Sequence, residues 1–122
     1  MSETIHELLI GGRRRPARSG ETFSVNEPAT GQPMATVAKA GLADVDDALA
    51  AATRAFEEGR WPHLSPTERG RVLLRAANLL RERSEVFAEV EARNAGKPIG
   101  DARWEVVDAA AATLEYFGGA AD

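Results

Sequence analysis

The stretch GLADVDDALAAATRAFEEG, residues 41–59, decides the fold, because the hydrophobic period of the chain changes there from two to 3.6. Gly41 can act as an N-cap residue, and Asp44 occupies the third helical position, where a carboxylate interacts favourably with the helix dipole. Gly59 ends the pattern. We therefore predict a helix with one apolar stripe, which consists of Val45, Ala48, Leu49, Ala52, Ala55 and Phe56.

Before this helix, residues 1–40 are typical of strands and turns. The segment ELLIGG, residues 7–12, predicts a short strand that ends in a glycine turn. TFSVNE, residues 22–27, alternates apolar and polar residues as a half-buried strand does, and PATGQP is typical of a turn. MATVAKA, residues 34–40, continues as the second strand of that pair, so we expect an antiparallel β-hairpin.

After residue 59 the chain is predicted to be helical to its end. Ser65 and Glu68 form a capping box around Pro66 at the first helical position, which is a strong start signal. The buried face of the helix that follows is predicted to consist of Leu73, Ala76, Ala77 and Leu80.

Two further helices are expected. Ser84 is predicted to cap a third helix, with Phe87 and Val90 directed inward. The last helix covers roughly residues 101–117 and ends at two glycines; its common face is predicted to hold Trp104, Val107, Ala111 and Leu114. The predicted fold class is α+β, with an N-terminal antiparallel β-hairpin followed by three to four α-helices.

The segment EARNAGKPIGD, residues 91–101, contains a Gly-Lys pair of the kind found in phosphate-binding loops. Such a loop also needs further glycines before the lysine, Ser or Thr after it, and a preceding strand, and all three are missing here. Gly96 instead lies where a left-handed C-cap belongs, and Pro98 cannot continue the helix. Lys97 is therefore interpreted as a residue that follows a helix end.

The composition excludes several classes of function. The 122 residues carry a net charge of −4, which argues against nucleic acid or an anionic membrane as a general partner. The absence of cysteine excludes disulfides, thiolate metal sites and a thiol nucleophile. His6 and His63 lack ligand-like spacing and are interpreted as surface residues. With no apolar run long enough to span a bilayer and no secretory signal, we expect a cytoplasmic location.

The segment RRRPARSG, residues 13–20, gathers four arginines around one proline. It could form an anion-binding patch, which would require salt-dependent binding. We favour a solvated loop that joins two strands, because no aromatic residues interleave with the arginines and the rest of the chain is acidic.

The order of these signals resembles the N-terminal segment of the aldehyde dehydrogenase superfamily, from about Leu8 to Asp122. LLIGG resembles the opening strand of the family, and NEPATGQPMATV resembles its Asn-Pro-Ala-Thr-Gly-Glu turn, with Glu27 inserted and Gln32 in place of the acid. The segment from Asp44 to Arg83 is similar to the first two helices, including the tryptophan between them. ARNAGKP resembles the helix stop of the family, and LEYFGGAAD resembles its aromatic-Gly-x-Ala-Asp helix end.

This resemblance implies the leading part of a Rossmann-type, cofactor-binding domain in an enzyme that oxidises an aldehyde to a carboxylic acid with NAD or NADP. In the family, a cysteine attacks the carbonyl, an asparagine and a backbone N–H hold the oxyanion, and a glutamate activates water. All of these groups lie C-terminal to the matching segment, so we assign no catalytic or cofactor-binding residue here. We expect neither NAD nor NADP to bind this chain alone.

The resemblance also implies one candidate ion site. Many members hold a structural monovalent cation with backbone carbonyls near the second strand and an acidic residue in the helix stop. The matching positions are Val25, Asn26 and Asn94. Asn94 places an amide where the carboxylate usually lies, and the alternative is that it bonds its own backbone at the helix end.

Two functions remain open. The chain is the N-terminal part of a dehydrogenase and inactive in isolation, or it is a stand-alone interaction or assembly module that keeps the fold without the chemistry. In the family, the apolar helix stripes face a sheet that this chain does not contain. We therefore expect the chain to bind the remainder of a dehydrogenase, to self-associate through these faces, or to be partly molten.

Overall fold

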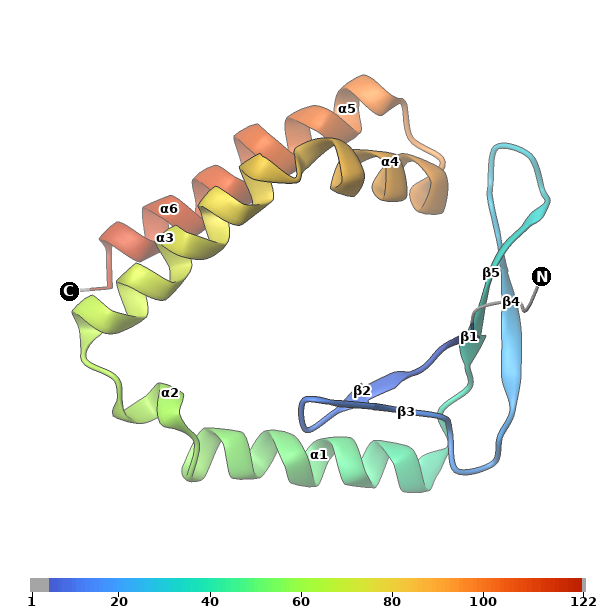
Figure 1. The fold of residues 1–122 in the computed structure, drawn as a ribbon, viewed down its shortest axis with the longest axis horizontal. Helices are drawn as coiled ribbons and strands as arrows, with labels where there is room; N and C mark the ends of the chain where they lie inside the picture. The colour runs from blue at the N-terminus through green and yellow to red at the C-terminus, as the bar shows by residue number, and fades with distance from the viewer. Residues whose placement is uncertain (1–4, 122) are drawn as a thin grey trace. The chain divides into compact units, whose positions relative to one another are not determined.

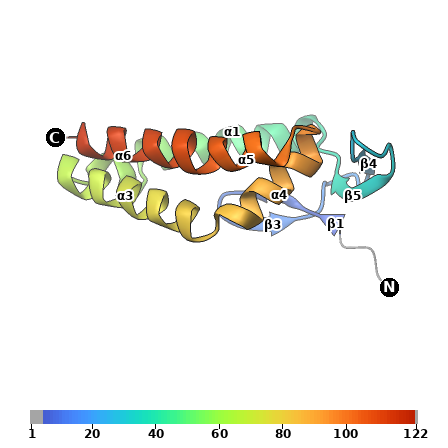
Figure 2. The ribbon, with the colours of Figure 1, turned by 90° about the horizontal axis from the view of Figure 1, so that it is seen from above.

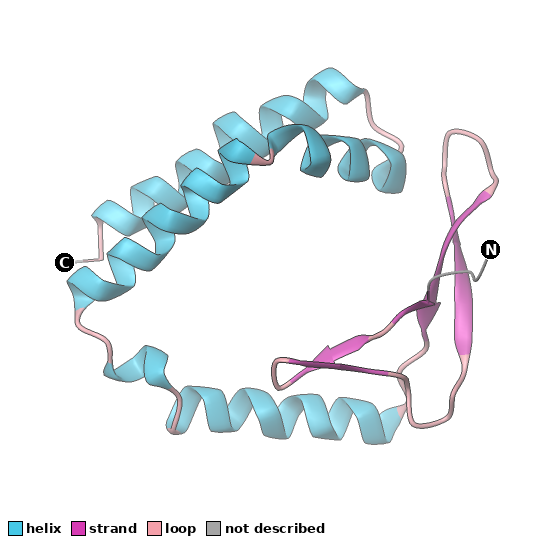
Figure 3. Cartoon of the chain, viewed as in Figure 1, coloured by secondary structure: helices cyan, strands magenta, loops and turns pink. Residues whose placement is uncertain are grey.

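The computed structural model describes residues 5–121, and the chain divides into two compact units (Figure 1). The first unit ends at Pro62 and the second begins at His63. All described strands belong to the first unit and precede the first helix, as the colouring of Figure 3 shows. This order confirms the predicted α+β class with its N-terminal strands and following helices.

The first unit contains a three-stranded mixed sheet with the strand order β1-β5-β4. β1 (Ile5–His6) runs parallel to β5 (Pro33–Ala38), and β4 (Thr22–Asn26) runs antiparallel to β5. Phe23 pairs with Val37 in the antiparallel ladder, which is the hairpin predicted from the alternating pattern. The register shifts between the last two residues of β4, so this strand ends in an irregular step.

A second, separate hairpin joins β2 (Leu8–Ile10) to β3 (Arg13–Arg15). Gly11 and Gly12 have φ angles of 59° and 77°, which only glycine adopts without strain, and they reverse the chain in two residues. The prediction of a loop was wrong for the first three arginines, because this tight turn brings them into register with β2.

Helix α1 (Leu42–Glu57) begins as predicted, with Gly41 as its N-cap. The carboxylate of Asp44 accepts a hydrogen bond from the Gly41 amide at 3.0 Å and so closes the first turn. The helix ends with Glu58 as its C-cap, directly before the predicted stop at Gly59, and a short helix α2 (Arg60–His63) follows.

The described residues of the second unit form helices joined by short connections, without a strand. Its elements are α3 (Pro66–Glu82), α4 (Ser84–Ala95), α5 (Ile99–Trp104), a π-helical segment η1 (Glu105–Ala111) and α6 (Ala112–Gly119). The last three elements follow one another without interruption. The capping box at the start of α3 is confirmed, because the Ser65 hydroxyl accepts from the Glu68 amide at 3.3 Å and the Glu68 carboxylate accepts from the Ser65 amide at 2.9 Å.

Helices α3 and α6 lie side by side in both views of the ribbon (Figures 1 and 2). Two glycines allow this close approach: a Cβ on Gly70 would lie 2.5 Å from the carbonyl oxygen of Gly118. A Cβ on Gly118 would lie 3.1 Å from Cγ of Leu74. The two backbones therefore meet where neither residue has a side chain.

Small residues fill the interior of the second unit. The fully buried apolar positions are Ala77, Ala88, Ala102 and Ala111, and Val106 packs with Ala88 and Ala102. Ala77 lies on the face of α3 predicted to be buried, and Leu73, Ala76 and Leu80 are half-buried beside it, so that prediction is confirmed. Such a core removes little apolar area from water for each residue.

Two predictions for α4 were wrong. Arg83, without a side-chain hydrogen bond, is the N-cap, and Ser84 is the first helical residue. Phe87 and Val90 are 44% and 58% exposed, whereas Ala88 is fully buried. The helix packs against α5 and η1 through this small residue, which is grouped with Ala102 and Val106.

The predicted face of the last helix was wrong at Trp104, which is 60% exposed. The prediction is confirmed at Ala111, which is fully buried, and Val107 and Leu114 are half-buried. Val106 is also buried, and it lies five residues before Ala111, which is the hydrogen-bond spacing of the π-helix that contains both. A constant period of 3.6 did not predict the burial of Val106, because the wider turns of η1 change which residues face inward.

Candidate functional site

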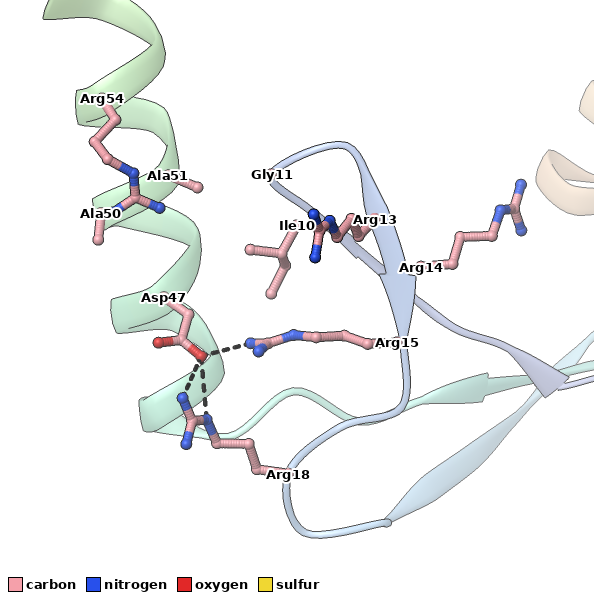
Figure 4. Close-up of a pocket in the computed structure, with 10 residues that line it drawn as sticks. All are labelled: Ile10, Gly11, Arg13, Arg14, Arg15, Arg18, Asp47, Ala50, Ala51 and Arg54. Carbon is pink, nitrogen blue, oxygen red and sulfur yellow. Dashed lines mark hydrogen bonds and ion pairs between the residues drawn. The ribbon is translucent and has the colours of Figure 1, made fainter. Parts of the chain in front are cut away.

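A polar pocket with a volume of about 650 Å³ lies between the β2–β3 hairpin and α1 (Figure 4). The hairpin and the loop after it supply most of its arginines, and α1 supplies one more arginine and one carboxylate. Its lining residues with charge are Arg13, Arg14, Arg15, Arg18, Asp47 and Arg54. We refer to it as the arginine pocket.

Two carboxylates of α1 fix the arginines of the hairpin and its loop. Asp47 accepts hydrogen bonds of 2.6 Å from Arg15 and from Arg18, and Figure 4 shows both guanidinium groups directed at it. Asp44 is 1% exposed and accepts the backbone N–H of Arg18 at 3.2 Å in addition to the cap bond. These bonds attach residues 15–18 to the first turns of α1.

The ion pairs favour the charged forms of their members. Hydrogen bonds from Arg18 and then Arg15 lower the pKa of the Asp47 carboxyl below its usual value. The hydrogen bond between Arg18 and Asp47 also raises the pKa of Arg18. In the second unit, the hydrogen bond from Arg81 lowers the pKa of Glu115. These groups are therefore ionised throughout the neutral pH range.

The residues predicted to hold a monovalent cation lie in different units. Val25 and Asn26 lie at the irregular end of β4, where the ladder shifts register. Asn26 accepts a 3.4 Å hydrogen bond from the Ser24 hydroxyl through its side-chain oxygen. Asn94 lies in the last turn of α4 and is exposed. The cation site therefore remains a prediction.

Lys97 follows the end of α4, as predicted. Gly96 closes that helix with a φ of 71°, and its N–H donates to the carbonyl of Ala92 at 2.9 Å. The ammonium group of Lys97 is bonded to the carboxylates of Glu91 and Glu105, and the first of these bonds is 2.8 Å long. Lys97 thus joins α4 to η1, and these hydrogen bonds raise its pKa.

Exposed apolar side chains are the second notable feature of the surface. The predicted stripe of α1 is uncovered within its unit: Leu49 is 62% exposed and Phe56 is 81% exposed. In the second unit, Trp104 and Tyr116 are 60% and 72% exposed. Large apolar surfaces of this kind usually mark a protein interface.

The described residues show few groups suited to catalysis or metal binding. Between residues 5 and 121, no three His, Cys, Asp or Glu side chains are grouped as metal ligands. His6 and His63 are both exposed. None of the helices within that range combines the length and the apolar character that a membrane crossing requires.

The sequence did not predict that Asp47 and Arg54 belong to the arginine pocket. The signal that could have found them is the spacing of Asp44, Asp47 and Arg54, which places them on one side of α1. Their proximity to the hairpin arginines depends on how the hairpin packs on α1. This packing cannot be predicted from local sequence patterns.

Comparison with protein families shows that residues 15–122 match the aldehyde dehydrogenase family. Among solved structures, an NAD-dependent aldehyde dehydrogenase from Sinorhizobium meliloti is 35% identical with a TM-score of 0.87, and the match covers 96% of this chain. PnpE from Pseudomonas sp. WBC-3 is 43% identical with a TM-score of 0.86 over 96% of this chain.

An aldehyde dehydrogenase from Bacillus cereus, solved in complex with NAD⁺, is 33% identical with a TM-score of 0.88 over 95% of this chain. The chain spans only 23% of the Sinorhizobium protein and 24% of the Pseudomonas and Bacillus proteins. The similarity thus covers nearly all of this chain and less than a quarter of each relative.

Proposed function

Since the chain belongs to the aldehyde dehydrogenase family, we propose that it serves as the N-terminal part of an enzyme that oxidises an aldehyde to a carboxylic acid with NAD or NADP. The observation that carries this proposal is the family match over residues 15–122. The solved relatives include complexes with NAD⁺, which favours the same class of cofactor for the complete enzyme.

The chain contributes structure to this enzyme and no reacting group. It has no cysteine, so it cannot supply the thiolate nucleophile that the family uses. The carboxylate of Asp44 is engaged in a helix cap, and those of Asp47, Glu105 and Glu115 form ion pairs with arginine or lysine. We therefore propose that the chain alone oxidises no aldehyde.

The partner that this proposal requires is the other three quarters of a dehydrogenase, whether in the same polypeptide or in a second one. The exposed stripe of α1, with Leu49 and Phe56, and the exposed aromatic residues of the second unit are its proposed docking surfaces. Burial of one large apolar side chain contributes roughly 1.5–3 kcal/mol, so several of them provide a large driving force.

Reconstitution of an active enzyme tests this proposal. The 122-residue chain is mixed with the Sinorhizobium aldehyde dehydrogenase from which the matching N-terminal 23% has been removed. We expect aldehyde-dependent reduction of NAD to require both parts. Leu49→Asp, in the exposed stripe, is expected to reduce the recovered activity by about tenfold or more.

Ala43→Asp serves as the matched control for that variant. It adds the same charge to α1 at an exposed position of the first turn that lies outside the apolar stripe. Equal activities of the two variants would contradict the proposed docking surface. Dehydrogenase turnover by the pure chain would contradict the proposal that the reacting groups lie in the remainder of the enzyme.

The second candidate function is a stand-alone interaction module. Its supporting observation is the close packing of α3 on α6 through Gly70 and Gly118, which buries part of the second unit without the remainder of the enzyme. Light scattering at several concentrations, with a hydrophobic dye in parallel, separates the two functions. A sharply melting monomer that binds no dye would favour the module.

A further inference from the structure

The arginine pocket has more positive charge than its carboxylates neutralise. Figure 4 shows the side chains of Arg13, Arg15 and Arg18 on the side of the hairpin that faces α1, whereas Arg14 is directed away from the helix. Arg54 adds a guanidinium group from α1. Against these four cationic groups stand the carboxylates of Asp44 and Asp47, so about two positive charges remain.

Several donors of the pocket have no partner among the described residues. Arg13 and Arg54 are exposed and form no ion pair with any carboxylate between residues 5 and 121. The Nε atom of Arg15 is buried and has no hydrogen-bond partner in that part of the chain. The exposed guanidinium groups of Arg13 and Arg54 can donate hydrogen bonds to the oxygens of a ligand without breaking an ion pair within the described residues.

An apolar cavity of about 330 Å³ adjoins the arginine pocket. The two share Ile10, Gly11 and Ala51 in their linings. The other residues that line the apolar cavity come from the hairpin and from α1: Leu9, Gly12, Ala48, Ala52 and Ala55. A ligand held by its charged end in the arginine pocket could therefore place an apolar group beside the alanines of α1.

We propose that the arginine pocket binds a phosphate dianion, either free or as the head group of a small phosphomonoester, through Arg13, Arg15 and Arg54. The charge of the dianion matches the two positive charges that the aspartates leave uncompensated. Guanidinium groups donate paired, charge-assisted hydrogen bonds to the oxygens of phosphate. The arginine pocket itself contains no residue of the apolar stripe of α1, although the adjoining cavity shares Ala48, Ala52 and Ala55 with that stripe. Binding of phosphate there does not depend on dehydrogenase chemistry.

Calorimetric titration of the 122-residue chain with inorganic phosphate tests the proposal, at constant ionic strength set with sodium chloride. We compare the double variant Arg13→Gln/Arg54→Gln with the control Arg71→Gln/Arg75→Gln. The control changes two exposed arginines of α3 and therefore alters the net charge equally. We expect saturable binding that the first variant weakens by about tenfold or more and the control leaves unchanged.

The same titration with phenyl phosphate distinguishes the two sources of the dianion. Tighter binding than inorganic phosphate indicates a phosphomonoester whose apolar group occupies the adjoining cavity, and Ala52→Asp should then abolish the difference. Equal affinity indicates free phosphate. Absence of saturable binding, or an equal response of the pocket and control variants, would overturn the proposal. Because no dehydrogenase remainder is present, this result is independent of the reconstitution test.

Discussion

The two units of the chain are stabilised by different kinds of contact. In the first unit, the hairpin and loop are attached to α1 by charged groups around the buried Asp44, and the large apolar residues of α1 are exposed. In the second unit, α3 and α6 meet at Gly70 and Gly118, and four alanines are fully buried. The second unit therefore has a closely packed interior of small residues, whereas the contact between α1 and the hairpin is mainly polar; both units have large exposed apolar side chains.

The largest expected effect is on the helix contact of the second unit. Gly70→Ala places a methyl group 2.5 Å from the carbonyl oxygen of Gly118, so the two helices must move apart. We expect a loss of about 3 kcal/mol in the free energy of unfolding, measured by urea denaturation. Gly119→Ala, in the same helix α6 with open space at its Cβ, is the control and should cost nothing.

A loss of about 2 kcal/mol is expected when Asp44 is replaced by Ala in the first unit. The change removes the acceptor for the N–H groups of Gly41 and Arg18 and a counter-charge for Arg15. Unfolding followed by the circular dichroism of α1 measures it. Asp46→Ala, at an exposed position of the same helix, is the control. Equal effects of the two changes would show that the hydrogen bonds of Asp44 to the loop and the helix cap do not stabilise this unit.

A smaller effect is expected on the pH dependence of the stability of both units. The pKa values of Asp47 and Glu115 are lowered in the folded chain by their arginine partners, so the folded state binds fewer protons than the unfolded state. The stability from these pairs is therefore present above the ordinary pKa values of 3.8 and 4.5 and is lost as the pH falls through the lowered ones. Thermal melts from pH 6 down to about pH 2 test this.

The variants Asp47→Asn and Glu115→Gln separate the contributions of the two units. Each should reduce the dependence of the melting temperature on pH in its own unit and leave the other unit unaffected. An unchanged acid response in both variants would show that these ion pairs are too exposed to contribute.

Local signals allowed much of this fold to be predicted from the sequence. The start of α1 at Gly41, the capping box at Ser65 and the left-handed helix end at Gly96 each depend on residues only a few positions apart. The pairing of β4 with β5 follows from a short turn between two alternating segments. Each of these features is determined by residues that are close together in the chain, so it can be predicted from a single sequence.

The failures have a common cause in packing between distant segments. The inward faces of α4 and of the last helix depend on a core of alanine and on a π-helical segment, and this is why Phe87, Val90 and Trp104 are exposed. The arginine pocket was missed because Arg54 joins the hairpin only through the packing of that hairpin on α1. The stripe of α1 was found, and its large residues Leu49 and Phe56 are exposed.

Hydrogen exchange of α1 and α3 in the same sample tests the central claim most directly. In the isolated chain, we expect the amides of α1 to exchange rapidly and those of α3 that face α6 to be protected. Addition of the Sinorhizobium dehydrogenase without its matching N-terminal segment should then protect α1. Equal protection of α1 and α3 in the isolated chain, or no change in α1 on addition of that partner, would contradict the account.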